Sequence, residues 1–438
     1  MEEYKKKQIL KLAARAGELM MKNGAEVTRV EDTIERICTA SGVDHVEVFA
    51  IPTGVFLSIE PDEEDGGVLT YIRRLHSNVT DLKKIHELNR FSRTFTTTSM
   101  TVEEGLAELE RIDSQPLYPL PLRLFGAALA AGMFGAIYSG NVLTTVLTAL
   151  VAVVCELVYR FFGRLGTNYF IKGMVCCGTA AVLAVFLKAV GLIPGIGAVV
   201  IGVLMLYTPG AALTNSIRDL LSGDILSGLT RLAETVLIAL SLATGVGIVL
   251  KIWTMAGTQP SADAASLPLA VTVLLGTLSV PGFSILFHAP GKCILPATIT
   301  GGAGWLVCQL CTEYGQGAAV SVFFGAFMVG GFSRIFAKTV KAPGTAFIIP
   351  GIIPLVPGAL TFYTMQAFFL GQVDNGLTLC LHTVSSAGAI ALGLLAVGAA
   401  AQIVHQIHHQ FFRSAKSADD DPDDLEWHHS SACDKIDG

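Results

Sequence analysis

Pro209-Gly210-Ala211 and Gly228-Leu229-Thr230 recur in this chain as Pro357-Gly358-Ala359 and Gly376-Leu377-Thr378. The offset is 148 residues without a gap, and 12 of the 37 aligned positions that begin at Pro209 are identical. Proline removes a backbone donor and glycine lets the chain turn freely, so each copy predicts a break within an apolar stretch. A break at corresponding positions of two halves is typical of a transporter's pathway. A duplication kept only for stability is the alternative.

The composition indicates a membrane protein. Of the 438 residues, 52% are apolar and only 15% are charged, whereas a soluble protein carries roughly 25% charged residues. Most of the nine cysteines lie in or beside apolar runs, where cysteine acts as a small hydrophobe, so neither a disulfide framework nor a metal site is expected. The chain opens on an amphipathic helix rather than a signal peptide, so we expect the N-terminus to stay in the cytoplasm.

Ten stretches are long and apolar enough to span a bilayer, which needs about 20 such residues. Lysine and arginine gather in alternate loops, as the positive-inside rule requires if both termini are cytoplasmic. The 148-residue offset crosses an odd number of spans, so the two copies run in opposite directions. The sequence therefore predicts a polytopic α-helical membrane protein with ten spans as inverted 5+5 repeats. The expected spans are 122–139, 141–161, 169–189, 192–214, 229–252, 266–288, 293–312, 316–335, 344–370 and 377–404.

An N-terminal module precedes these spans. Helical periodicity predicts helices before residue 41, and apolar runs bounded by turn residues predict strands at 46–51, 55–59 and 68–72. A module of this size can hold its own core, so we expect a cytoplasmic α+β domain. The expected limits are 1–117 for this domain, 118–253 for the first five-span membrane half, 254–265 for a linker, 266–407 for the second five-span half and 408–438 for a disordered, acidic cytoplasmic tail.

The breaks are the expected place of the substrate pathway, because backbone groups freed there must line a cavity or meet neighbouring helices. Helix N-termini just after Pro209 and Pro357 would present N–H groups to a carboxylate. A simple proline kink is the alternative for either break alone. The charged residues that follow the first break have no charged counterparts in the second copy, since Asp219 aligns with Ala367 and Arg231 with Leu379, so a single asymmetric site is expected at the first break. The candidate substrate-binding and pathway residues are Pro209, Gly210, Thr214, Asn215, Arg218, Asp219, Asp224, Pro357 and Gly358.

Three ionisable residues in or beside spans are candidates for proton coupling, because such groups are costly in a membrane. Arg231 precedes Glu234 by three residues, so it either tunes a proton-carrying Glu234 or simply neutralises it. His382 occupies the position that aligns with Glu234, where a neutral, hydrogen-bonded histidine is the alternative. In another span, Glu156 and Arg160 are expected to pair at i and i+4.

Glu26, Arg29 and Glu31 are candidate gate residues of the cytoplasmic domain. Glu26 and Arg29 can pair on one helix face because they are three residues apart. A solvated ion pair at a helix start is the alternative to a gating surface that docks onto the membrane part.

Long segments resemble the bacterial threonine/serine exporter family. Gly24-Ala25-Glu26-Val27-Thr28-Arg29-Val30-Glu31-Asp32-Thr33 and Pro52-Thr53-Gly54-Val55-Phe56-Leu57-Ser58-Ile59 are similar to its soluble head. The stretch from Pro209 to Asp224 and the stretch from Pro350 to Gly358 are similar to its two membrane blocks. The resemblance implies a fused, single-chain exporter of threonine and serine, driven by the proton gradient. Some relatives are split over two proteins, and those are associated with succinate export.

The leading interpretation is a secondary active exporter of small hydrophilic metabolites, with threonine/serine efflux coupled to protons by alternating access. No segment reads GxxxxGK[ST], so ATP is not expected to drive transport directly, and neither a cofactor nor enzymatic activity is expected. The expected partners are the substrate, protons and the lipid bilayer of the bacterial inner membrane; no nucleic acid is expected, and homo-oligomerisation stays open. A succinate or dicarboxylate exporter, an intramembrane hydrolase and a gated channel are the alternatives.

Overall fold

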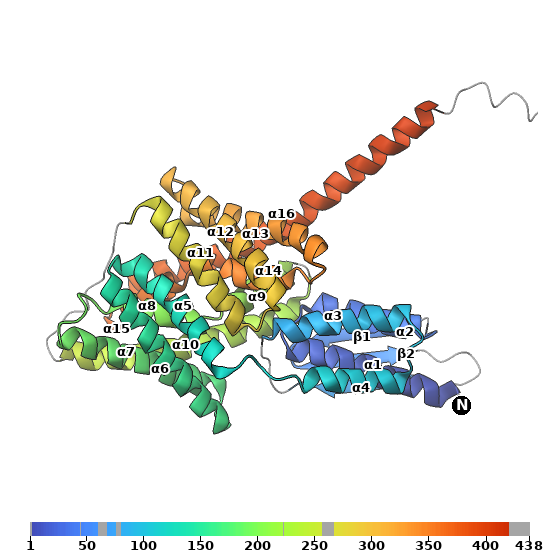
Figure 1. The fold of residues 1–438 in the computed structure, drawn as a ribbon, viewed down its shortest axis with the longest axis horizontal. Helices are drawn as coiled ribbons and strands as arrows, with labels where there is room; N and C mark the ends of the chain where they lie inside the picture. Colours follow the sequence, from blue (N-terminus) through green and yellow to red (C-terminus); the bar gives the residue numbers. More distant parts are fainter. Residues whose placement is uncertain are drawn as a thin grey trace, which may run out of the picture.

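The computed structural model describes residues 2–43, 45–59, 68–75, 80–221, 223–255 and 267–419 (Figure 1). Helices make up most of this part of the chain, and a three-stranded sheet lies in the N-terminal region. The N-terminal elements gather at one end of the molecule and the long apolar helices at the other, as Figure 1 shows.

The N-terminal region contains the three strands that the sequence predicts. They form an antiparallel sheet in the order β1-β2-β3, with Ala50 opposite Val55 and Ser58 opposite Thr70. The Asp81 side chain accepts hydrogen bonds from the backbone N–H groups of Lys83 and Lys84 and so caps the third helix. In chain order the elements are α1 (Glu2–Lys22), α2 (Val27–Ala40), β1 (Val46–Ile51), β2 (Gly54–Ile59), β3 (Leu69–Arg74), α3 (Leu82–Thr97) and α4 (Val102–Asp113).

The apolar helices follow without further strands in the described residues. Eight of them are long and apolar enough to cross a membrane, and a pair bent by 45°, residues 345–355 with 358–369, meets the same criterion as a ninth. The elements are α5 (Leu120–Ser139), α6 (Val142–Arg164), α7 (Tyr169–Ala189), α8 (Gly197–Tyr207), α9 (Gly210–Leu221), α10 (Ile225–Met255), α11 (Leu269–Leu286), α12 (Gly291–Glu313), α13 (Ala318–Val340), α14 (Thr345–Ile352), the 3-10 turn η1 (Ile353–Leu355), α15 (Gly358–Phe369) and α16 (Val373–Asp419).

The fourth predicted span, 192–214, is divided in the structure. Its apolar part forms α8, a helix of 11 residues, and α9 begins after Pro209 as a separate helix. Proline cannot donate the backbone hydrogen bond that would continue α8, which accounts for the division. The described helices therefore supply eight to nine candidate spans by length and composition, with α8 as a shorter apolar helix beside them.

The 148-residue repeat reappears in the boundaries of the helices. α9 begins at Gly210 and α15 begins 148 residues later at Gly358. The same offset separates the starts of α8 and α14, the ends of α9 and α15, and the starts of α10 and α16. The hydrogen bonds repeat as well, because the N–H of Gly210 donates to Thr208 and that of Gly358 to Val356, both at 2.8 Å. The two copies share their local backbone structure.

Corresponding helices also pack in corresponding ways. α7 lies along α10 as α13 lies along α16, and α5 lies beside α11 (Figure 1). Around the breaks the two halves interlock, since α15 contacts α8 and α10 while α9 contacts α16. The broken helices of both halves consequently meet at the contact between the halves.

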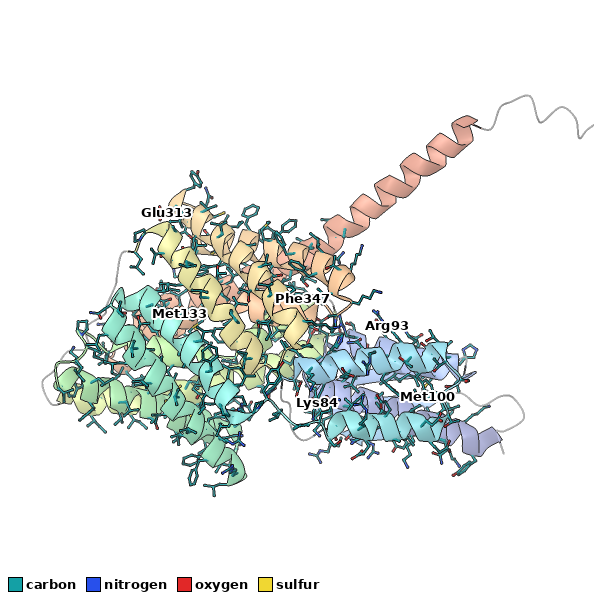
Figure 2. All side chains as sticks on the ribbon, viewed as in Figure 1. Lys84, Arg93, Met100, Met133, Glu313 and Phe347 are labelled. Atoms are coloured by element: carbon teal, nitrogen blue, oxygen red, sulfur yellow. The ribbon has the colours of Figure 1, made fainter. Side chains whose placement is uncertain are left out.

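The N-terminal elements pack directly onto the membrane helices. Val30, Ile34 and Ile37 recur on one face of α2 and are fully buried in the N-terminal core. The same cluster includes Ala289, between α11 and α12, and Ile349 of α14. In Figure 2, Lys84, near the start of α3, lies at the end of the N-terminal region next to the membrane helices, whereas Met100, which follows the end of α3, lies farther from them.

The ends of the two halves differ from the expected limits. α10 continues to Met255, so the predicted linker at 254–265 begins in its last two residues, and residues 256–266 lie outside the described part. α16 continues to Asp419, past the predicted limit at 407, and Figure 1 shows its end projecting from the bundle. The acidic run of the predicted tail, from residue 420 onward, lies outside the described residues.

Candidate transport site

The two Pro-Gly breaks lie against each other. A Cβ placed on Gly210 would be 2.5 Å from both γ carbons of Val356, which stands two residues before Gly358. A Cβ placed on Gly358 would be 2.1 Å from the sulfur of Met205, near the end of α8. Distances below 3.0 Å leave no room for a side chain, so glycine permits each close approach. The sequence predicts both breaks, but not that they touch.

Each break starts a new helix whose first N–H groups have no intrahelical acceptor. In α9 the first intrahelical bond runs from the N–H of Leu213 to the carbonyl of Pro209, at 2.9 Å. In α15 the corresponding bond runs from Thr361 to Pro357, at 3.0 Å. The amides before these bonds, together with the positive end of each helix dipole, can favour an anionic group.

Asp219 and Arg231 form an ion pair at the end of the first copy that faces the N-terminal region. Asp219 is 6% exposed on α9, and the Nε atom of Arg231 on α10 lies 3.4 Å from its Oδ2. The Nη2 atom of Arg231 also donates to the carbonyl of Ala25, just before α2, at 3.1 Å. Arg231 thus joins both membrane helices to the N-terminal region. Direct neutralisation of Glu234 by Arg231, one of the two alternatives left open above, is not what the structure shows, because the Arg231 side chain extends towards α9 and the N-terminal region.

Glu234 has a different partner, which sequence reasoning missed. Its Oε1 accepts a hydrogen bond from the hydroxyl of Tyr169 at 3.0 Å, and Glu234 is half-buried. Tyr169 is the first residue of α7, which lies along α10.

The remaining candidates are spread over the region of the breaks and beyond. Asn215 and Asp224 are half-buried on α9 and directly before α10. His382, by contrast, is exposed on α16. The side chains of Thr214 and Arg218 lie outside the described part of the structure.

Glu31 brings a second carboxylate to the junction between α10 and the N-terminal region. It accepts a hydrogen bond from the N–H of Ala50 at 2.9 Å, and the carbonyl of Ala50 in turn accepts from Ser227 at 3.4 Å. Burial and the negative charge of Asp224 raise the pKa of Glu31, partly offset by the bond from Ala50. The helix α2 begins after Glu26, and Arg29 is half-buried in its first turn. Among the three candidate gate residues, Glu31 interacts electrostatically with Asp224 of the first copy.

A further buried ion pair joins α5 to α6. Nη2 of Arg123 lies 2.5 Å from Oε1 of Glu156, which is nearly inaccessible. Arg160, the predicted i, i+4 partner, also acts on Glu156 electrostatically, but the direct ion pair is with Arg123. Arg123 takes that place because α5 packs along α6 and brings the guanidinium across. Only the crossing of the two helices could have identified this partner.

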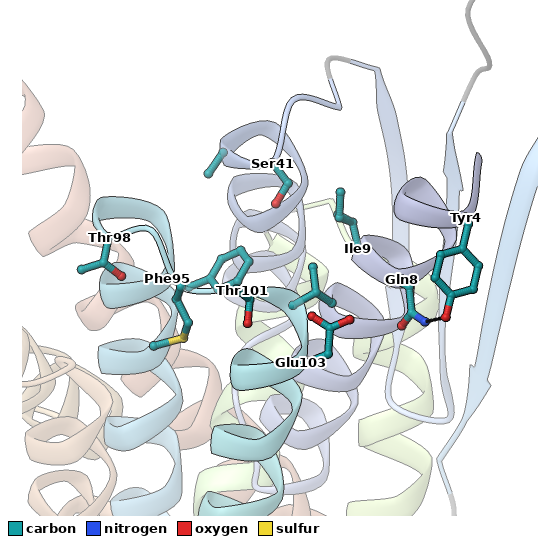
Figure 3. Close-up of a pocket in the computed structure, with 11 residues that line it drawn as sticks. Tyr4, Gln8, Ile9, Ser41, Phe95, Thr98, Thr101 and Glu103 are labelled. Carbon is teal, nitrogen blue, oxygen red and sulfur yellow. Dashed lines mark hydrogen bonds between the residues drawn. The ribbon is translucent and has the colours of Figure 1, made fainter. Parts of the chain in front are cut away.

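The described structure also has an open cavity of about 670 Å³ at the end of the N-terminal region away from the membrane helices (Figure 3). Tyr4 and Gln8 of α1 line one side, and Phe95 and Thr98 line the other. On that side, the side-chain nitrogen of Gln8 donates a hydrogen bond to the Tyr4 hydroxyl at 2.8 Å. This cavity is distinct from the region of the two breaks.

Comparisons with known proteins agree with one another. A family profile described as "Putative threonine/serine exporter" matches residues 11–253, and one described as "Threonine/Serine exporter, ThrE" matches residues 272–400. The chain is 26% identical over 401 residues to the "Probable threonine/serine exporter" of Mycobacterium tuberculosis, covering 89% of this chain and 75% of that protein. It is 21% identical over 399 residues to the "Threonine/serine exporter" of Corynebacterium glutamicum, covering 88% and 81%.

A shorter relative matches part of the chain. The "Probable succinate transporter subunit YjjP" of Escherichia coli is 22% identical over 264 residues, which cover 59% of this chain and 99% of that protein. No solved structure matches.

Proposed function

The chain belongs to the threonine/serine exporter family, and we therefore propose that it exports threonine and serine as a secondary active transporter. It is a multi-pass membrane protein, since eight of its described helices are long and apolar enough to span a bilayer. The observation that carries the proposal is the contact of the two Pro-Gly breaks, with Gly210 against Val356 and Gly358 against Met205. Broken helices that meet between duplicated halves are where transporters bind their substrates.

Alternating access follows if the two halves run in opposite directions. The hydroxyl of Tyr118, just before α5, donates to the carbonyl of Ala289, just after α11, at 2.6 Å. Since α5 and α11 correspond to each other and lie side by side, this contact supports an antiparallel arrangement of the halves. Exchanging the conformations of two such halves would exchange inward and outward openings.

The ends of the broken helices support the same orientation. α9 ends beside the N-terminal region, where Asp219 meets Arg231. Phe369, at the end of α15, instead lies against Gly247 of α10, about 33 Å along the helix from its start at 1.5 Å per residue. The corresponding helices thus end at opposite sides of the bundle.

We take α8 with α9 as the tenth span, the counterpart of the bent pair in the second half. This gives ten spans in the bacterial inner membrane, with both termini in the cytoplasm. The contacts of the N-terminal region with Ala289, Ile349 and Ser227 support this arrangement, because these three segments face the same side in the ten-span topology.

The substrate site is proposed at the first break. The N–H groups at the start of α9 would hold the substrate carboxylate, as helix N-termini hold anions. Asn215 is half-buried one turn further along α9 and offers an amide that can bond a hydroxyl or an ammonium group. The pair of Asp219 with Arg231 closes the inner side, where the charge of Asp224 also acts on Glu31 across the N-terminal junction.

Proton coupling is proposed at Glu234. It lies three residues after Arg231 on α10 but accepts its hydrogen bond from Tyr169 on α7. A carboxylate held by a neutral donor can gain and lose a proton without first breaking an ion pair. Because His382 is exposed, it is the weaker candidate.

Efflux from vesicles tests the function. The purified full chain is placed in liposomes loaded with labelled threonine, serine or succinate, and an outside-acid pH gradient is imposed. We expect threonine and serine to leave faster with the gradient than without it, and faster than from protein-free liposomes. Efflux of succinate alone would instead favour a dicarboxylate exporter, the function named for the relative YjjP. Efflux at the same rate with and without the pH gradient would exclude proton coupling but would still support the exporter function.

A further inference from the structure

His288 occupies an unusual place between the N-terminal region and the membrane helices. It lies in the connection between α11 and α12 and is only 5% exposed. Both of its chain neighbours are held from across the junction. The carbonyl of Phe287 accepts from the N–H of Leu82, the first residue of α3, at 3.0 Å, and that of Ala289 accepts from the Tyr118 hydroxyl at 2.6 Å. The imidazole is therefore enclosed where α3 docks.

The backbone at this position does not call for histidine. His288 has a φ of 54°, in the left-handed region that favours glycine. Gly140, 148 residues earlier, occupies the same position after α5 and has a φ of 61°. The first copy thus has the residue that this turn prefers, whereas the second copy holds a bulky side chain under strain. Strained, buried residues of this kind gather at functional sites.

The surroundings of the imidazole are polar and mainly positive. Neither ring nitrogen has a hydrogen-bond partner among the described atoms, and the ring lies 5.7 Å from that of Tyr118. Asp81, Lys83 and Lys84 act on it from the start of α3, and Arg123 acts on it from α5. Burial lowers the pKa of His288, and Arg123, Lys84 and Lys83 lower it further, against the opposing effect of Asp81.

We propose that His288 is a proton-sensitive latch that holds α3 against the α11–α12 connection when neutral and releases it when protonated. A neutral imidazole can stay enclosed between the two parts. A protonated one would add a positive charge near Lys83, Lys84 and Arg123, against the carboxylate of Asp81, although Arg123 is itself paired with Glu156. The carboxylate of Asp81 is already engaged by the N–H groups that it caps. Charging the ring therefore favours separation of α3 from the connection.

The sign of the pH dependence follows from linkage. The docked state lowers the pKa of His288, so the undocked state binds more protons, and docking weakens as the pH falls through the ordinary histidine value of about 6.5. One proton changes the docking equilibrium by at most about tenfold per pH unit. Glu31 at the same junction has the opposite effect on docking, because its pKa is raised. Its effect occurs at lower pH, where carboxyl groups titrate. A comparison above pH 6 therefore excludes the carboxyl group and leaves the two histidines of the junction, His288 and His86, which the variants below separate.

Hydrogen exchange of the full chain in lipid nanodiscs tests the latch, with the amide of Leu82 as reporter. Protection is expressed relative to the intrinsic exchange rate at each pH, so the chemical pH dependence of exchange cancels. We expect the protection of Leu82 to fall several-fold between pH 7.5 and pH 6, and to stay constant in His288→Asn. Asparagine tolerates the left-handed backbone and cannot be protonated, and His288→Gly serves as a second such variant.

His86 provides the matched control, because it is a half-buried histidine of α3 whose pKa is also lowered by burial and by Lys292. His86→Gln should keep the pH dependence of the wild type. An equal fall of protection in wild type and His288→Asn would overturn the latch, and so would loss of the dependence in His86→Gln alone. The experiment measures docking rather than transport, so its result does not depend on which substrate the protein exports.

Discussion

The backbone of Gly210 lies against the side chain of Val356, so that a Cβ at position 210 would stand 2.5 Å from both of its γ carbons. Gly210 begins the helix after the first break, and Val356 directly precedes the second. The two halves of the chain therefore meet at their least regular points. Neither broken helix can move without displacing the other, because packed interiors leave no free space between them.

Gly210→Ala should strongly reduce threonine efflux, since the added methyl group has no room beside Val356. Overpacking of this kind costs about 1–3 kcal/mol, and the helices can relieve it only by moving apart. Val356→Ala should restore part of the activity in the double variant, which efflux from liposomes would measure. Gly388→Ala on α16 is the matched control, because a Cβ there meets nothing within 4 Å. Normal efflux in Gly210→Ala would make the first break a mere kink.

Glu234→Gln should abolish the acceleration of efflux by a pH gradient while leaving threonine exchange at zero gradient. The amide keeps the hydrogen bond from Tyr169 but cannot take up a proton. Tyr169→Phe should have the smaller effect, because it removes only the donor. Parallel measurements of gradient-driven efflux and of exchange separate these outcomes. Full gradient-driven efflux in Glu234→Gln would exclude this carboxylate as the carrier.

Arg231→Leu and Asp219→Ala introduce the residues of the second copy, Leu379 and Ala367. Each single change removes one charge of a pair with little exposure, and we expect a cost of about 1–3 kcal/mol because the remaining charge loses this partner but keeps its other contacts. The double variant should be less destabilised than the sum of the single ones, by about 0.5–3 kcal/mol. Thermal unfolding in detergent measures this coupling, with Thr230→Val on the same helix as control. Strict additivity would mean that the two charges do not interact.

Glu31→Gln should tighten docking of the N-terminal region at pH 7 but not near pH 4. Burial and the charges of Asp224 and Asp32 raise the pKa of Glu31. The docked state therefore binds the proton more strongly, and docking loses stability as the pH rises through the ordinary carboxyl value of about 4.3. Hydrogen exchange at Ala50 reports the change, and Glu47→Gln on an exposed face of β1 is the control. Weaker protection of Ala50 in Glu31→Gln at pH 7 would contradict this sign.

Several features of the fold could be read from the chain because they depend on local chemistry. The three strands follow from apolar residues with strand-forming side chains between turn residues, and the helix starts at Gly210 and Gly358 follow from the prolines before them. The division of the fourth predicted span was less apparent, because the hydropathy of 192–214 is continuous across Pro209. Hydropathy sums over a window, whereas a helix ends at a single missing donor.

The amino-acid sequence was sufficient to establish the repeat, its breaks and the apolar character of the helices, since each depends on residue type and spacing along one chain. The partners of the charged groups came from the three-dimensional arrangement. Arg231 bonds Asp219 and the carbonyl of Ala25 rather than Glu234, and Glu234 bonds Tyr169, 65 residues away. Long side chains reach several neighbours on the same helix equally well, so the crossing of helices selects among them. For the same reason, the contact between the two breaks emerged only when both halves were folded together.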